Sequence, residues 1–238
     1  TQDLNQISAM NISTPRNVRT AYDKLAAPQP DLLSRGWVAN AARIVSEDPA
    51  FQRMLDANLD KHGRDKFLKK LQKKNYAKNT FKDPAIKRTI VQTVAADVSA
   101  MRTLGVSFRE TAIRMGRSRW GSNESAPVVT FASTGNTARA YQLSKARPME
   151  SMEPVSDRIL NLAARMSIGA AEGSQRAASD KLVSNTRMNQ CLTWARLNLN
   201  QCKAAAAKPS ELAYCTSEHA LKERADCWSW LVSFDDTI

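Results

Sequence analysis

The sequence predicts an all-α protein: an irregular multi-helix bundle with a C-terminal disulfide-braced antiparallel helical hairpin. Three observations support this class. Almost every segment with a hydrophobic period has the helical one, strand-prone runs are scarce, and four cysteines lie at helical spacing near the C-terminus. A chain of 238 residues is also long enough to bury a substantial apolar core.

The first expected helices are amphipathic. One covers about 33–45, and its apolar residues share one face. The next begins at Asp48, which is a good N-cap, with Pro49 in the first turn. Gly63 is expected to end that helix, and a basic helix follows from about 64 to 75.

The longest expected helix begins at Asp83–Pro84 and keeps its apolar register as far as Leu104. We expect Gly105 to end it, because glycine is a common helix terminator. Ser107 and Glu110 then have the spacing of a capping box, which predicts a short separate helix after the glycine.

The middle of the chain is different in composition. Residues 116–131 are rich in glycine and serine and end in a short β-prone run, so we expect a loop there, followed by a weak helix over 133–145. The predicted organisation is a basic helical region over 1–146 and a second helical region over 154–238. The two regions could pack together as one domain.

The strongest signal is the placement of the four cysteines, all in the last fifth of the chain: Cys191, Cys202, Cys215 and Cys227. Within each successive pair the cysteines are about three helical turns apart, so each pair lies on one face of its own helix. Asn185 can cap the first helix and Ser210 the second, which gives a hairpin over 185–232.

Pairing Cys191 with Cys227 and Cys202 with Cys215 centres both bridges near Pro209, where the sequence also predicts a turn. We therefore predict these two disulfides. Free buried thiols are one alternative. A zinc site is the other, although structural zinc ligands usually come in pairs two to four residues apart, unlike these.

The hairpin is similar in geometry to the twin-cysteine helical hairpins of the CHCH proteins of the mitochondrial intermembrane space. The similarity covers only the cysteine-bearing tail. In that family the cysteines of each helix stand closer together than here, where ten and eleven residues separate them. The resemblance therefore implies a shared geometry and not a shared ancestry.

Disulfides predict an oxidising compartment. The chain begins with Thr1 and not with methionine, which fits removal of a signal peptide. No apolar run approaches the roughly 18–20 residues of a membrane-spanning helix. We therefore expect an exported protein, periplasmic or secreted, that is soluble as given.

The net charge of +12 is concentrated in the N-terminal half. Residues 61–88, here called the basic segment, contain 11 lysines and arginines but only Asp65 and Asp83 as acids. Such a surface attracts anionic polymers and lipid headgroups. The candidate anion-binding residues are Lys66, Lys69, Lys70, Lys73, Lys74 and Lys78.

The alternative for the basic segment is a helix docked on the core whose lysines are only solvated. Lysine supplies point charge without the bidentate geometry that reads bases, so we expect no sequence-specific nucleic-acid recognition. The expected partner is an anionic envelope polymer, a membrane surface or another protein. The expected function is non-enzymatic binding or a structural role at a bacterial cell envelope or in the secreted fraction.

Catalytic signals are weak. The chain has only two histidines, His62 beside a helix end and His219 on the inner face of the hairpin, and we expect neither to be catalytic. No catalytic motif was found, and we expect no metal and no cofactor. The rival hypothesis is a glycan- or lipid-acting hydrolase that uses Glu124 in the 117–127 loop, beside Arg119 and Trp120.

Overall fold

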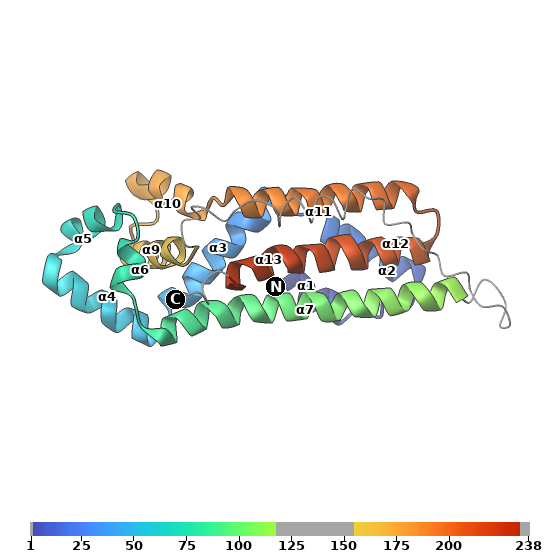
Figure 1. The fold of residues 1–238 in the computed structure, drawn as a ribbon, viewed down its shortest axis with the longest axis horizontal. Coiled ribbons are helices and arrows are strands. Elements are labelled where there is room, and N and C mark those ends of the chain that lie inside the picture. Colours follow the sequence, from blue (N-terminus) through green and yellow to red (C-terminus); the bar gives the residue numbers. More distant parts are fainter. Residues whose placement is uncertain (1, 118–154, 234–238) are drawn as a thin grey trace. The chain divides into compact units, whose positions relative to one another are not determined.

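The computed structural model describes residues 2–117 and 155–233, and within these residues the regular structure is entirely helical (Figure 1). The described chain divides into two compact units. Unit 1 comprises residues 2–27, 100–117 and 194–224, and unit 2 comprises residues 28–99, 155–193 and 225–233. The predicted all-α class is confirmed.

Unit 1 contains α1 (Gln2–Ser8), α2 (Pro15–Ala26), α12 (Pro209–Cys215) and the π-helix η2 (Thr216–Lys222). Unit 2 contains α3 (Pro30–Ser46), α4 (Pro49–His62), α5 (Arg64–Leu71), α6 (Tyr76–Thr80), α9 (Val155–Ser167), η1 (Gly173–Gln175) and α10 (Arg176–Val183). Three helices contribute residues to both units: α7 (Pro84–Arg117), α11 (Thr186–Ala205) and α13 (Glu223–Ser233). Among the described helices, none combines the length and the hydrophobicity that crossing a membrane requires.

Two of the expected N-caps are confirmed. The Asp48 carboxylate accepts hydrogen bonds from the Ala50 and Phe51 amides at the start of α4. The Asn185 side chain accepts one from the Met188 amide, 3.0 Å away, at the start of α11. These bonds satisfy amides that the first turn of a helix leaves without an intrahelical partner.

The expected cap of the second hairpin arm is wrong. Helix α12 begins at Pro209, so Ser210 lies inside its first turn and Lys208 is the N-cap residue. The Glu211 carboxylate reaches back to accept the amide hydrogens of Lys208 and Ala207, at 2.9 and 2.7 Å. The glutamate at the third helical position, and not the expected serine, therefore caps this helix.

The expected break at Gly105 is also wrong, because α7 runs without interruption from Pro84 to Arg117. Its apolar register continues past the glycine, with Leu104 and Phe108 both buried. The Ser107 hydroxyl donates to the Thr103 carbonyl, 3.3 Å away, and so does not cap a new helix. Burial of the apolar face outweighs the weak helix propensity of one glycine.

The basic helix predicted over about 64–75 is shorter than expected, and a second short helix follows it. Helix α5 ends at Leu71, and Asn75 adopts a left-handed conformation with φ 58° before α6 begins at Tyr76. Asparagine is among the few non-glycine residues that tolerate this conformation. The chain therefore turns within the basic segment.

Both predicted disulfides are confirmed. Cys191 is bonded to Cys227 and Cys202 to Cys215, with Cα–Cα distances of 5.8 and 5.6 Å. They cross-link α11 to an antiparallel second arm, α12–η2–α13 (Figure 1). The second arm holds eleven residues between its cysteines and α11 holds ten. A π-helical turn contains one residue more than an α-helical turn, so η2 accommodates the extra residue.

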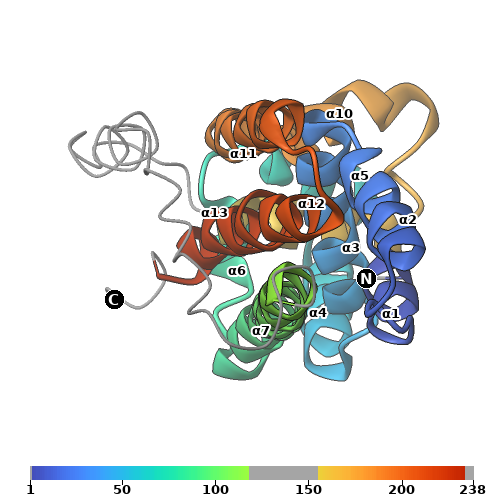
Figure 2. The same cartoon turned by 90° about the vertical axis from the view of Figure 1, so that its right-hand side faces the viewer.

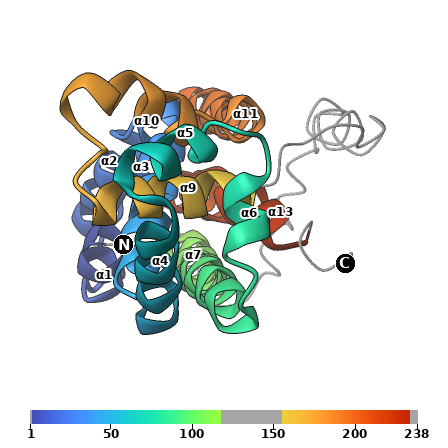
Figure 3. The same cartoon turned by 90° about the vertical axis from the view of Figure 1, so that its left-hand side faces the viewer.

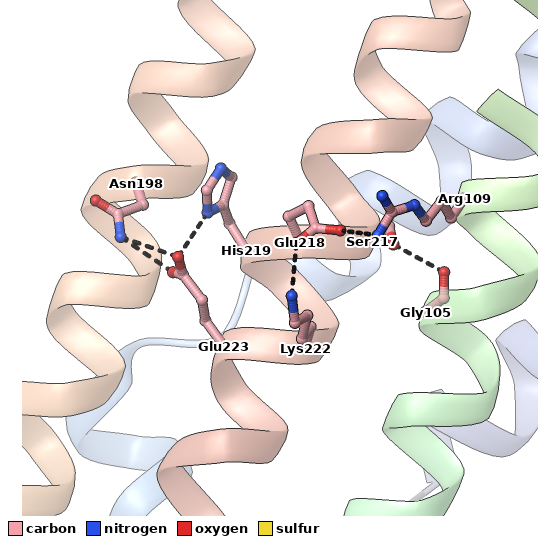
Figure 4. A network of polar contacts seen from close by, with 8 residues as sticks. All are labelled: Gly105, Arg109, Asn198, Ser217, Glu218, His219, Lys222 and Glu223. Carbon is pink, nitrogen blue, oxygen red and sulfur yellow. Dashed lines mark hydrogen bonds and ion pairs between the residues drawn. The ribbon is translucent and has the colours of Figure 1, made fainter. Parts of the chain in front are cut away.

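In unit 1, α2 packs against α12 (Figure 2). It also packs against η2. Polar contacts also hold η2 to residues 100–117 of α7, and the Asn198 side chain of α11 donates to the Glu223 carboxylate at the start of α13 (Figure 4). The Ser217 hydroxyl donates to the Gly105 carbonyl, 2.8 Å away. The Glu218 carboxylate lies 3.2 Å from an Arg109 guanidinium nitrogen.

In unit 2, α9 is the central helix, and it packs against α3, α6 and α10 (Figure 3). Its apolar side chains are buried, including Ile159, Leu160 and Ala163. The loop expected over 116–131, except its first two residues, and the helix expected over 133–145 lie outside the described residues. Glu124 lies there as well.

Candidate anion-binding site

The basic segment is held on unit 2 by its few apolar side chains. Phe67 and Leu71 of α5 are buried, as is Phe81 just after α6. The Phe81 ring packs on that of Phe51 with their centroids 4.5 Å apart, and the Tyr76 ring meets the Phe67 ring edge-on. The apolar side of the segment is therefore used in the core, and its basic side faces outward.

A polar stripe on α9 fixes the backbone of the segment. Asp157, Asn161 and Arg165 are four residues apart, so they share one face of the helix. The Asp157 carboxylate accepts the Lys78 amide hydrogen at 2.7 Å, in the first turn of α6. The Asn161 side chain donates to the Leu71 carbonyl, at the end of α5.

Arg165 completes this stripe. Its side chain is only 2% exposed, and burial lowers the pKa of its guanidinium. The Nε hydrogen is donated to the Asn161 side-chain oxygen at 2.9 Å and an NH1 hydrogen to the Gln175 side chain at 3.2 Å. The arginine thereby orients the Asn161 amide, whose nitrogen then points to the end of α5. Both short helices are thus held at fixed positions on α9.

Four of the six candidate lysines are exposed: Lys66, Lys69, Lys73 and Lys74. Within the described chain, none of these four lies within ion-pair distance of a carboxylate. Lys78 is half-buried on α6. Four exposed positive charges thus lie on one short stretch of the chain without carboxylate partners, and such charges attract anions.

Lys70 is half-buried and differs from the others. Its ammonium lies 2.9 Å from Nε2 of His62, at the end of α4, and 5.9 Å from the centroid of the Tyr76 ring. Desolvation and then the positive charges of Lys70, Lys61 and Lys66 lower the pKa of His62. The imidazole is therefore neutral at pH 7 and accepts a hydrogen bond from the Lys70 ammonium.

His219 has the packing position expected of it. It is 15% exposed, and its Nδ1 lies 2.9 Å from the Glu223 carboxylate, which also accepts from the Asn198 side chain (Figure 4). These three residues link η2 and α13 to α11 within unit 1. These contacts place the histidine side chain between helices.

Sequence reasoning found the lysines but missed the residues that position them, namely Asp157, Asn161 and Arg165. A signal was present. In the otherwise apolar stretch VSDRILNLAARM, three polar residues recur every four positions and share one helical face. A polar stripe on the buried side of a helix indicates hydrogen bonds to other backbone segments, since buried polar groups are nearly always paired.

The fold and the site define a class: an all-α, disulfide-cross-linked basic protein with an outward-facing lysine cluster. No family of known proteins matches the chain, and neither a curated protein nor a solved structure is detectably similar to it. Its function must therefore be argued from its own residues.

Proposed function

We propose that this is an exported, non-enzymatic protein that binds an anionic surface or polymer of a bacterial cell envelope through the lysines of the basic segment. The observation that carries the proposal is the set of four exposed lysines without acidic partners on helices fixed to α9. Each lysine near an anionic surface contributes about 1 kcal/mol to binding. Four such lysines together contribute about 4 kcal/mol to binding at low salt.

The burial of the apolar side chains supports a particular mode of binding. Phe67 and Leu71 are at most 1% exposed, so they are not available to insert into a bilayer. Binding through the segment would therefore be electrostatic, at the level of phosphate or other anionic groups. Interactions of this kind weaken steeply as salt screens the charges.

The disulfides support the proposed location. Two cross-links between the hairpin arms indicate an oxidising environment, because cytosolic thiol systems keep most cysteines reduced. The bacterial periplasm and the extracellular space are such environments. Both bring a protein into contact with anionic lipids and acidic wall polymers, which are the proposed ligands.

The experiment measures retention of the whole chain on phosphatidylglycerol vesicles and on a heparin column as salt is raised. A variant in which Lys66, Lys69, Lys73 and Lys74 are all changed to glutamine should lose most of its retention. Four lost contacts of about 1 kcal/mol each correspond to roughly a thousand-fold weaker binding at low salt.

A charge-matched control separates this surface from net charge. Changing Arg16, Arg19, Arg176 and Lys181 to glutamine also removes four exposed positive charges, but outside the basic segment. The control should keep nearly all of the retention. If both variants elute alike, the basic segment has no special part in binding and its lysines serve solubility alone.

A further inference from the structure

His62 and Lys70 form a close contact within the basic segment. The Lys70 ammonium lies 2.9 Å from Nε2 of His62 and 3.3 Å from Nδ1, which joins the end of α4 to the middle of α5. An ammonium has hydrogens only to donate, so the imidazole must supply a lone pair. Protonation of that nitrogen would remove the bond and place two positive charges side by side.

We propose that His62 is a further residue of the anion-binding surface, and that it takes up a proton when a phosphate- or sulfate-bearing polyanion binds. Protonation frees the Lys70 ammonium from the imidazole, so that both groups then face the ligand. This inference rests on the proposed function of the basic segment, and it adds a binding residue and a pH response to that surface.

The charged groups around the imidazole support the proposal. Lys61 on α4 and Lys66 and Lys70 on α5 disfavour its protonation in the free protein, and together with desolvation they lower its pKa. The acids nearest in sequence, Asp60 and Asp65, are exposed, and neither has a hydrogen bond to the ring. On α3, which also packs on α4, Arg43 is paired with Glu47 and Arg35 with Asp180.

The sign of the pH effect follows from linkage. A bound polyanion offsets the field of the three lysines, so the pKa of His62 must be higher in the complex than in the free protein. A group with a higher pKa in the complex takes up a proton on binding, and binding then strengthens as pH falls through that window. One added positive charge at the binding surface makes the complex roughly five-fold tighter at pH 5.5 than at pH 7.5.

The test uses the full chain with heparin, whose sulfates stay ionised throughout this pH range. The imidazole signals of His62 and His219 are followed by NMR from pH 5 to pH 8 with and without heparin, and the dissociation constant is measured at both pH values. We expect heparin to raise the pKa of His62. His62→Gln should lose the five-fold gain in affinity between pH 7.5 and pH 5.5, whereas His219→Gln should keep it.

The outcomes separate the two proposals. If heparin binds through the lysines but the His62 signal does not move, or if His62→Gln keeps the full pH response, the role of His62 is refuted and the binding function stands. If the wild type does not bind heparin or anionic vesicles at either pH, both proposals are refuted. Circular dichroism of His62→Gln checks that α4 and α5 are still formed.

Discussion

Glycine has two opposite roles in this chain, and both depend on backbone conformation. Gly63 has φ 69°, a left-handed value that side chains with a Cβ rarely adopt, and it ends α4. Gly36 and Gly105 lie inside α3 and α7, where glycine is intrinsically unfavourable. A Cβ on Gly105 would meet the Ser217 carbonyl at 3.6 Å, an ordinary contact distance.

These positions give a stability prediction. Gly36→Ala and Gly105→Ala should each raise the free energy of unfolding by about 0.5–1 kcal/mol, because alanine is the better helix former. Gly63→Ala should lower it by about 1–3 kcal/mol, because φ 69° with ψ 155° is a conformation that almost only glycine adopts. Urea denaturation measures all three. A loss of stability in Gly105→Ala would mean that α7 and η2 pack more closely than described.

Asn161 is the residue on which the position of the basic segment depends most. Asn161→Ala would remove the donor to the Leu71 carbonyl and the acceptor of the Arg165 Nε hydrogen, both in a buried setting. We expect a loss of roughly 1–3 kcal/mol for each group left unpaired. The measurement is chemical denaturation, together with amide hydrogen exchange of α5.

The matched control is Asn79→Ala, an asparagine of α6 whose side chain is exposed. Exposed substitutions of this kind usually change stability by less than about 0.5 kcal/mol. Equal effects of the two substitutions would contradict the anchoring role of α9.

At the scale of single residues, the sequence was most reliable where the chemistry is local. The caps at Asp48 and Asn185 depend on side chains two or three positions from the amides that they satisfy, and both were predicted correctly. The buried hydrogen bond from Asn161 to Leu71 joins residues 90 positions apart. A contact over such a distance cannot be predicted from a single sequence.

Helical elements were predicted well in type and less well in extent. The sequence indicated a stop at Gly105 and a basic helix that reached about residue 75, and both were wrong. At Gly105 the burial of Phe108 and Thr111 carries the helix through a poor helix former. The chain turns at Asn75, and Phe81 beyond the turn packs on Phe51. This is a tertiary contact, which the local sequence does not indicate.

The hairpin shows the opposite case, in which a long-range feature could be predicted. Cysteine pairing is constrained by geometry, since two antiparallel helices bring residues together around a common midpoint. The spacing therefore gave both disulfides correctly. It did not reveal η2, because the one-residue difference between the arms does not say where the second arm widens.

The two disulfides should differ in their contribution to stability. Cys202 and Cys215 are separated by 13 residues and Cys191 and Cys227 by 36. By the chain-entropy relation, removing the shorter cross-link by Cys→Ala changes at both positions should cost about 3 kcal/mol, and removing the longer about 4 kcal/mol. Thermal denaturation of the two double variants measures the difference. A larger loss from the shorter loop would show that packing of the sulfurs, and not loop closure, controls the effect.

At the scale of the whole molecule, the sequence correctly predicted the all-α class. The division into two units was not evident from it, because each unit combines segments from distant parts of the chain. Contacts such as that of Arg35 on α3 with Asp180 on α10 hold unit 2 together. They join positions with no relation in sequence.

The proposed location and function of the protein depend on its four cysteines forming two disulfides in the native protein. The direct measurement is the intact mass of protein from its natural source, before and after reduction, followed by peptide mapping of the unreduced chain. We predict that reduction adds about four hydrogens, and that the linked peptides join Cys191 to Cys227 and Cys202 to Cys215. No mass change on reduction, or any other pairing, would contradict an exported protein braced by this hairpin.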